Sequence, residues 1–208
     1  MKFLKKINIG LVLTIITILA VIIYLVSAEN SRKGYKDEIK FACDSYISAI
    51  NKYSVLPEDA QKIGIDSNSV NLDNFYNDME KELKNVSASE SSAKIQKLIL
   101  EDWIKKDLLD TSNIMVGYDK KIVKILSYDF DGNQVTVTFN SRATIREKYI
   151  DINPETGEQG EKSKESSYDN KSETITLEKK DDGWKVVYAN LDYNLYNSSY
   201  QNNMSSIM

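Results

Sequence analysis

The side chains that could do chemistry in this chain are few, because the two most versatile residue types are nearly missing. The 208-residue sequence contains no histidine and one cysteine, Cys43. Histidine is the usual general base near neutral pH and the commonest metal ligand, so its absence excludes histidine-based catalytic triads and typical zinc sites. Cys43 cannot form an internal disulfide, and its apolar neighbours on an expected helix predict a buried, unreactive thiol.

One acidic stretch resembles a calcium-binding loop. Residues 129–133 read Asp-Phe-Asp-Gly-Asn, which places oxygen ligands at alternate positions. A calcium loop of this kind has a glutamate at position twelve, whereas that position is Asn140 in this chain. Gly132 directly follows the second aspartate, which suits a hairpin turn with a positive φ. We therefore predict a turn at this place, and we expect no metal site and no cofactor.

The other acid pairs fall on expected helices and among lysines. This pattern is typical of solvated helix faces and not of catalytic dyads. The pairs are Glu80 with Glu82 and Glu101 with Asp102. No residue is therefore predicted to be catalytic, and the sequence favours a protein that is not an enzyme.

The charge of the chain argues against nucleic acid as a partner. The formal net charge is −4, and leaving out Lys2, Lys5 and Lys6 leaves 24 basic and 31 acidic residues, a net charge of −7. Nucleic-acid phosphates bind to concentrated basic surfaces, so an acidic domain is not expected to bind DNA or RNA. The richness in Lys, Ile, Asn and Tyr is typical of AT-biased genomes and favours a Gram-positive bacterial source.

The N-terminal segment predicts a membrane anchor. Residues 7–28 form an uncharged apolar run behind the three lysines, and about 20 such residues in a helix span the hydrocarbon core. The basic flank predicts a cytoplasmic stub at residues 1–6 and an extracytoplasmic domain at residues 29–193. A second interpretation is a signal peptide cleaved after Ala28, where small residues stand at the cleavage position; the domain would then be secreted.

Three amphipathic helices are expected to follow the anchor. They span residues 31–53, 71–86 and 89–109, with a short break near Gly34 and a helical turn opened by Pro57. In each helix apolar residues recur every three or four positions, which predicts a face that packs against a sheet. The apolar residues that the third helix would bury are Ile95, Leu98, Ile99, Trp103 and Ile104.

Four antiparallel strands are predicted after the helices, so the expected fold class is α+β, with three helices packed on a curved four-stranded antiparallel sheet. The strands are expected at residues 122–130, 135–149, 173–179 and 184–191. Alternation over residues 135–149 is the strongest pattern in the chain, and its interruption at Ser141 predicts a bulge. Apolar residues on both faces of the fourth strand predict a central or doubly covered strand.

A long mobile loop is predicted between the second and third strands, at residues 153–167. Loops of this length often carry binding residues, which makes this one the predicted interaction loop. The residues expected to meet a partner are Asn153, Glu155, Gly157 and Gln159. Beyond the last strand, the Asn- and Ser-rich residues 194–208 predict a flexible polar tail.

The order of these patterns resembles a known superfamily. Helices are followed by a strand, an Asp-Gly-Asn turn into Val-Thr-Val-Thr at residues 135–138, a long hairpin, and a strand entered by Asp-Asp-Gly-Trp-Lys-Val-Val at residues 181–187. Over residues 31–193 this order is similar to membrane-anchored extracytoplasmic bacterial members of the nuclear transport factor 2-like superfamily, which have the cystatin-like cone fold. The resemblance implies a bent sheet curled around the first helix, with a pocket between sheet and helices. For single-anchor proteins of this length, the resemblance extends to the assembly factor of type IV secretion and conjugation systems.

Three functions are compatible with these patterns. The first is a non-enzymatic scaffold that binds other membrane or envelope proteins, or itself, within a cell-envelope or conjugative secretion complex. The second is a small-ligand-binding or sensing module that uses the cone pocket. Its walls, which suit core positions equally well, would be Tyr46, Tyr76, Trp103, Phe139 and Trp184. The third is an enzyme related to the isomerases and dehydratases of the superfamily, with Tyr149 or Asp129 as the available acid or base.

Overall fold

The computed structural model describes the backbone of residues 9–193, and the side chains of residues 14–23 and 34–193. The chain divides into two compact units, Met1–Lys40 and Phe41–Met208. Helix α1 (Ile9–Tyr53) contributes to both units. It passes through Gly34 without interruption, so the predicted break was wrong; a helix interior tolerates one glycine at a cost of about 1 kcal/mol. The predicted stub and tail, residues 1–6 and 194–208, lie outside the described residues.

In the first unit, the described part of α1 exposes aliphatic side chains in every direction. All ten residues from Thr14 to Ile23 are exposed and uncharged. Among the described residues, no helix contains a stretch that is both long and apolar enough to cross a membrane. The predicted anchor at residues 7–28 extends beyond the described side chains, so it stays a prediction.

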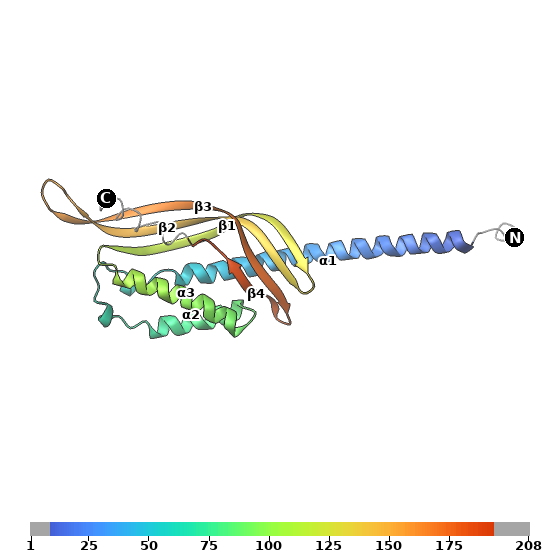
Figure 1. Ribbon diagram of the computed structural model, residues 1–208, viewed down its shortest axis with the longest axis horizontal. Helices are drawn as coiled ribbons and strands as arrows, with labels where there is room; N and C mark the ends of the chain where they lie inside the picture. The colour runs from blue at the N-terminus through green and yellow to red at the C-terminus, as the bar shows by residue number, and fades with distance from the viewer. Residues whose placement is uncertain (1–8, 194–208) are drawn as a thin grey trace, which may run out of the picture. The chain divides into compact units, whose positions relative to one another are not determined.

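The second unit is built on one antiparallel sheet whose strands follow one another in chain order (Figure 1). The strands are β1 (Asn113–Asp131), β2 (Gln134–Ile152), β3 (Gln159–Lys180) and β4 (Gly183–Asn190). The predicted α+β class with four antiparallel strands is therefore confirmed. The fourth strand lies at an edge of the sheet, so of the two predicted alternatives, central or doubly covered, the central one was wrong.

The hairpin between β2 and β3 is much longer than the sequence predicted. Pairing continues to the last residue pair, Ile152 with Gln159, and only residues 153–158 remain as a turn. Hydrogen bonds from Gly157 N to Asn153 O, 2.8 Å, and from Asn153 N to Glu158 O, 2.9 Å, close this turn. The predicted mobile loop at residues 153–167 was wrong, because most of these residues satisfy their backbone groups in the β2–β3 ladder.

Strand β2 carries the buried face of the sheet. Its buried side chains are Val135, Val137, Phe139, Ser141, Ala143, Ile145 and Glu147. The pairing with β3 shifts between Phe139 and Ser141, which confirms an irregularity at the predicted place. The additional residue belongs to β3, where Ser172 has φ 57° and its backbone N donates to Asn140 Oδ1 at 3.2 Å.

Helices α2 (Asp73–Val86) and α3 (Glu90–Leu109) lie on the same side of the sheet (Figure 1). Two short 3-10 turns, η2 (Glu58–Ala60) and η3 (Ser67–Ser69), connect α1 to α2. Ser89 caps α3 by accepting a hydrogen bond from Ser92 N at 3.1 Å, as expected for a serine before a helix. The sequences of α2 and α3 favour helices because they contain no Pro or Gly and each begins with a polar residue.

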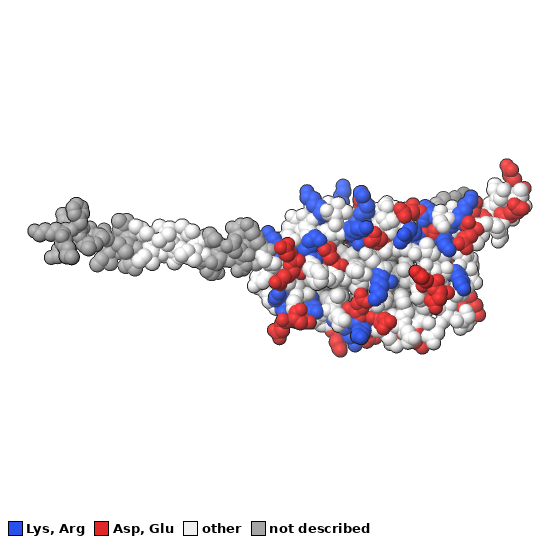
Figure 2. Space-filling view, turned by 180° about the vertical axis from the view of Figure 1, so that it is seen from behind, with Lys and Arg blue, Asp and Glu red and all other residues white. Residues whose placement is uncertain are grey.

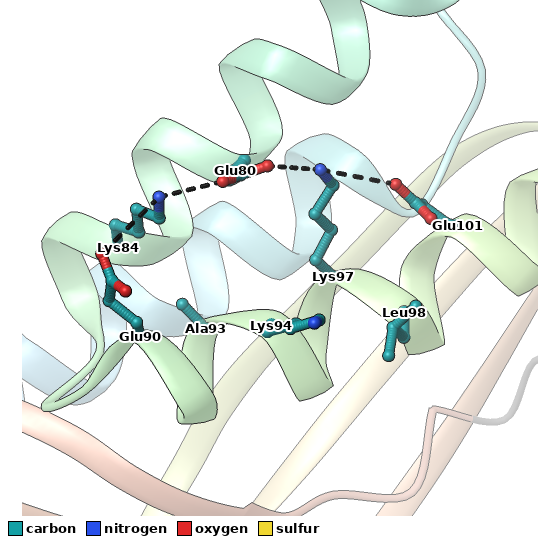
Figure 3. A pocket seen from close by; sticks show the side chains of 8 residues that line it. All are labelled: Glu80, Lys84, Glu90, Ala93, Lys94, Lys97, Leu98 and Glu101. Atoms are coloured by element: carbon teal, nitrogen blue, oxygen red, sulfur yellow. Dashed lines mark hydrogen bonds and ion pairs between the residues drawn. The ribbon is translucent and has the colours of Figure 1, made fainter.

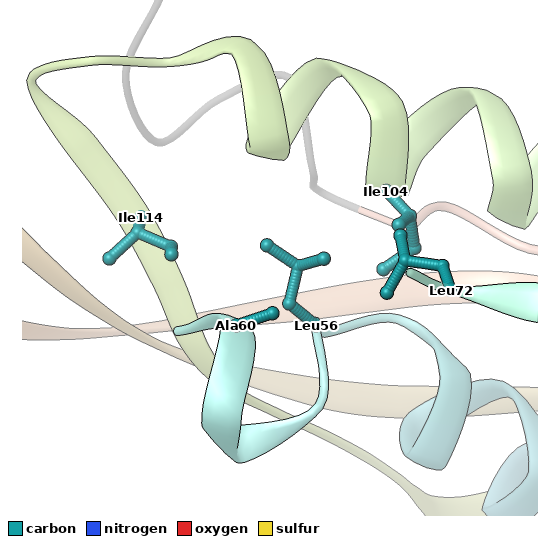
Figure 4. Close-up of a cluster of buried hydrophobic side chains, with 5 residues drawn as sticks. All are labelled: Leu56, Ala60, Leu72, Ile104 and Ile114. Atoms are coloured by element: carbon teal, nitrogen blue, oxygen red, sulfur yellow. The ribbon is translucent and has the colours of Figure 1, made fainter. Parts of the chain in front are cut away.

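One end of the core joins the α1–α2 connection to α3 and β1 (Figure 4). Leu56 and Ala60 from the connection meet Leu72, Ile104 and Ile114, and all five are buried. Burying such side chains is worth about 1.5–3 kcal/mol each for Leu and Ile. This cluster fixes the C-terminal half of α3 against the start of β1.

The other end of α3 is fixed by the edge strand β4. Ala88 N donates to Val186 O at 2.7 Å, and Ser92 Oγ donates to Val187 O at 2.9 Å. A parallel bridge joins Ser87 to Val186. These bonds use part of the free edge of β4, and together with the core cluster they determine which face of α3 points outward.

Candidate functional site

The strongest interior candidate is a set of polar groups that we call the interior polar cluster: the buried side chains of Lys120, Ser141, Asn170 and Glu173, and the backbone of Asp192. Each of the three longer strands supplies at least one member, and Asp192 follows β4. Lys120 and Glu173 are 0% and 4% exposed at their side chains. Buried charges of this kind occur at catalytic sites and in structural ion pairs, so their bonding pattern decides between the two.

The side chains of Lys120 and Glu173 bond to other members of the interior polar cluster. Lys120 Nζ donates to Glu173 Oε1 at 2.7 Å and to the Asp192 carbonyl oxygen at 2.7 Å. The same Oε1 accepts the backbone N–H of Asp192 at 2.6 Å, and Oε2 accepts the Ser141 hydroxyl. Asn170 Nδ2 donates to the Asp192 carbonyl oxygen at 3.2 Å.

The electrostatics of the interior polar cluster suit a structural ion pair. Burial lowers the pKa of Lys120, and its hydrogen bond to Glu173 opposes that shift. Asn51 on α1 holds the Lys120 backbone in place, accepting its N–H at 2.9 Å and donating to its carbonyl at 2.9 Å. A catalytic base must reach the proton that it removes, and neither charged group is exposed. The cluster therefore ties α1, the sheet and the chain after β4 together.

A second buried polar group surrounds Gln96 on α3. Tyr46 and Tyr193 donate from their hydroxyls to Gln96 Oε1 at 2.7 Å and 3.1 Å. Burial raises the pKa of Tyr46 and Tyr118, and it raises the pKa of Tyr193 to about 12, so these phenols stay neutral at physiological pH. Gln96 Nε2 and the Tyr118 hydroxyl are buried and have no hydrogen-bond partner among the described residues.

Asp107 on α3 has a carboxyl group whose pKa is raised by its surroundings. Burial raises its pKa from 3.8 to about 7, and the nearby Asp110 and Glu147 add to the shift. Its Oδ1 accepts the Met115 N–H at 3.0 Å, while Oδ2 is buried with no hydrogen-bond partner in the described part of the chain. No group of three or more acidic, His or Cys residues in that part is arranged to hold a metal ion.

A groove of about 290 Å³ runs between α2 and α3 (Figure 3). A chain of alternating charges crosses it: Lys84 contacts Glu80 at 2.9 Å, Glu80 contacts Lys97, and Lys97 contacts Glu101 at 3.6 Å. Hydrogen bonds from Lys97 and Lys84 lower the pKa of Glu80 to about 2. The contact of Glu80 with Lys97 joins α2 to α3, whereas the other two contacts lie within one helix.

The outer surface of α3 exposes three aliphatic residues that the sequence predicted to be buried. Ile95, Leu98 and Ile99 are 62%, 55% and 45% exposed, and we call them the α3 face. Trp103 and Ile104, predicted with them, are buried. The prediction was wrong for the α3 face because the helix turns Gln96 and Leu100 toward the core instead.

The charged side chains around the domain are mixed in sign. Figure 2 shows acidic and basic residues interspersed on the face in view, without a continuous basic area. Many are paired across neighbouring elements, for example Arg142 on β2 with Asp169 on β3 at 2.7 Å.

The five predicted pocket-wall residues lie largely in the core. Tyr46, Trp103, Phe139 and Trp184 are buried. Tyr76 is half-buried and packs, with Phe75, against the core cluster of Figure 4. Core burial is what these side chains show, and a ligand pocket bounded by them stays a prediction.

The predicted interaction loop and the acid or base candidates are widely separated. Asn153, Glu155 and Gly157 lie in the exposed β2–β3 turn, and Gln159 begins β3. Tyr149 pairs with Asn113 at one end of the β1–β2 ladder, and Asp129 pairs with Thr136 near the other. Thirteen residues of strand separate the two positions, on the order of 40 Å, so the structure does not bring Tyr149 and Asp129 together.

Sequence reasoning missed the interior polar cluster and the unusual carboxyl of Asp107. The available signal was the pair of polar residues, Ser141 and Glu147, at inward positions of an otherwise apolar strand face. A polar residue on a buried face needs a partner, and the partner of Ser141 is Glu173.

No protein-family model matches the chain, and no curated protein matches it.

Proposed function

We propose that this chain is a non-enzymatic interaction domain that is anchored in a membrane by its N-terminal helix and binds proteins through the α3 face. The observation that carries the proposal is the exposure of Ile95, Leu98 and Ile99 side by side on one helix. Adjacent exposed aliphatic residues mark protein-binding surfaces more often than isolated ones.

The energetics of the α3 face favour a partner. Each of its three side chains is about half exposed, so covering them would contribute about 1 kcal/mol apiece. Ion pairs border the face, including Asp102 with Lys106 at 2.6 Å. An apolar centre with a charged rim is the usual composition of a protein interface.

The membrane anchor is supported by the aliphatic, uncharged and exposed residues between Thr14 and Ile23. With the lysines before this run, the domain would lie on the extracytoplasmic side. Assignment to a cell-envelope or conjugative secretion complex rests on the resemblance to the nuclear transport factor 2-like superfamily and its secretion assembly factor.

A second candidate function is a ligand-binding or sensing module, and one observation favours it. Gln96 Nε2 and the Tyr118 hydroxyl are buried without hydrogen-bond partners in residues 34–193. Buried polar groups are normally satisfied, so a small polar molecule could form the hydrogen bond that either group lacks. Chemical-shift changes at Gln96 on titration with a library of small polar compounds would support this candidate, and their absence would refute it.

The interaction function is tested by photocrosslinking the full-length chain in cell membranes. A photoreactive amino acid replaces Leu98, and the control replaces Asn77, an exposed residue of α2. We expect adducts with a specific protein, identified by mass spectrometry, from position 98 and not from position 77. Equal or no labelling from the two positions would refute the proposed function.

A further inference from the structure

We infer that the α3 face binds a second copy of this chain, with the two α3 helices antiparallel and Leu98 on a twofold axis. This inference rests on the proposed function and names its partner. It is carried by the order of charges along one row of the helix surface, which we call the α3 row.

The α3 row consists of residues four positions apart: Lys94, Leu98 and Asp102. All three are exposed, and residues at this spacing lie next to one another along a helix. Their order is positive, apolar, negative. Ile95 and Ile99 lie in the neighbouring row, beside Leu98.

This order is complementary to itself only when it is reversed. In an antiparallel pair centred on Leu98, Lys94 of one copy faces Asp102 of the other. The twofold axis repeats this contact, so the pair has two contacts between opposite charges and an apolar centre. A parallel pair in register would place like charges opposite one another at both positions.

The present contacts of the α3 row do not oppose this pairing. Asp102 contacts Lys106 at 2.6 Å. Exposed ion pairs contribute little, and a carboxylate can accept from more than one donor. Contacts within the helix explain why charged residues occur in the α3 row. They do not explain why Leu98 is exposed.

The size of the α3 face sets the strength of the association. Three aliphatic residues from each copy form a small apolar centre, so we expect weak self-association in dilute detergent solution. Confinement to one membrane surface raises the local concentration of the chains and favours the pair. The first test is therefore made with the full-length chain in membranes.

Disulfide formation at single cysteines tests the position of the axis. In Leu98→Cys the two thiols meet across the twofold axis, and we expect a disulfide-linked dimer. In Lys94→Cys or Asp102→Cys the like positions are displaced by about 12 Å along the helices, too far for a disulfide. Mixing the Lys94→Cys and Asp102→Cys chains should restore crosslinking. The native Cys43 is buried, so the unchanged chain and Asn77→Cys should give no disulfide-linked dimer.

Charge reversal provides a second test that needs no cysteine. Lys94→Glu places two like-charge contacts in the pair and should weaken self-association about tenfold, as read from sedimentation in detergent. The double variant Lys94→Glu/Asp102→Lys exchanges the signs and should restore it. Both positions are exposed, so neither variant alters the core.

The outcomes separate this inference from the proposed function. A Leu98→Cys yield no higher than that of Asn77→Cys overturns the second-copy inference. If photocrosslinking from position 98 then captures a different protein, the proposed function still holds. A link from position 98 to residues 194–208 of the same chain also overturns the inference, and no specific adduct from position 98 overturns both proposals.

Discussion

Replacing Asp107 by asparagine should stabilise the domain, and it should do so more at high pH than at low pH. The Asp107 carboxyl is buried next to Asp110 and Glu147, which raises its pKa from 3.8 to about 7. The folded state therefore binds a proton more tightly than the unfolded state does. The contribution of the Asp107 carboxyl to stability is highest below pH 4, falls as the pH rises toward 7, and is constant above that range.

The size of the effect follows from the two pKa values. Raising the pKa from 3.8 to about 7 corresponds to a penalty of about 4 kcal/mol at pH 8, where the folded carboxyl is charged. At pH 5 the folded carboxyl is largely protonated, and the penalty is about 1.5 kcal/mol. Asparagine keeps an oxygen for the Met115 N–H, which Asp107 Oδ1 now accepts at 3.0 Å, and carries no charge. The stabilisation by Asp107→Asn should thus be about 2–3 kcal/mol greater at pH 8 than at pH 5.

The measurement is urea unfolding of the full-length chain at both pH values, followed by the fluorescence of the buried Trp103 and Trp184. The matched control is Asp78→Asn, because Asp78 is an exposed aspartate on α2 and should change stability by less than about 0.5 kcal/mol. If the Asp107→Asn difference were the same at pH 5 and pH 8, the folded carboxyl would have an ordinary pKa and the reasoning would fail.

Three further predictions test the interior, a turn and the orientation of α3. Lys120→Met leaves the Glu173 carboxylate buried without its cation and should lower the free energy of unfolding in urea by about 3–5 kcal/mol. Adding Glu173→Leu should recover part of the lost stability. A double variant that is still less stable would contradict the ion-pair account. Gly132→Ala should lower the free energy of unfolding by about 1 kcal/mol, because Gly132 has φ 58° and open space around it, and an unchanged melting temperature would contradict the turn geometry. Leu98→Ser should change stability by less than about 0.5 kcal/mol, whereas Leu100→Ala should cost about 3 kcal/mol; equal costs would mean that α3 is rotated from the described position.

The sequence predicted the sheet well where one face alternates and poorly where it does not. Val135, Val137 and Phe139 are buried as the alternation predicted. The first half of β3, from Gln159, has no such alternation because nearly all of its side chains are exposed. Its strand structure comes from backbone pairing with β2, which leaves no pattern in the side chains.

The interior polar cluster was beyond local sequence patterns. Ser141 and Glu173 are 32 residues apart, and Lys120 and Asp192 are 72 residues apart. Each of these residues is polar and, taken alone, would be expected on the surface. Only the pairing of β1, β2 and β3 brings them together. The same holds for Asp107, whose neighbour Glu147 comes from β2.

Helix α3 shows why its outer face is informative about function. Apolar residues occur on both sides of this helix, so periodicity could not tell the core face from the α3 face. Residues far away in the sequence determine which face of α3 is buried. Gln96 is buried because Tyr46 on α1 and Tyr193 after β4 donate to it. The folded domain thus buries a glutamine while Ile95, one position before it, stays 62% exposed. Since core packing does not use Ile95, Leu98 and Ile99, the domain would fold equally well with polar residues there, and their aliphatic character is best explained by a surface that covers them.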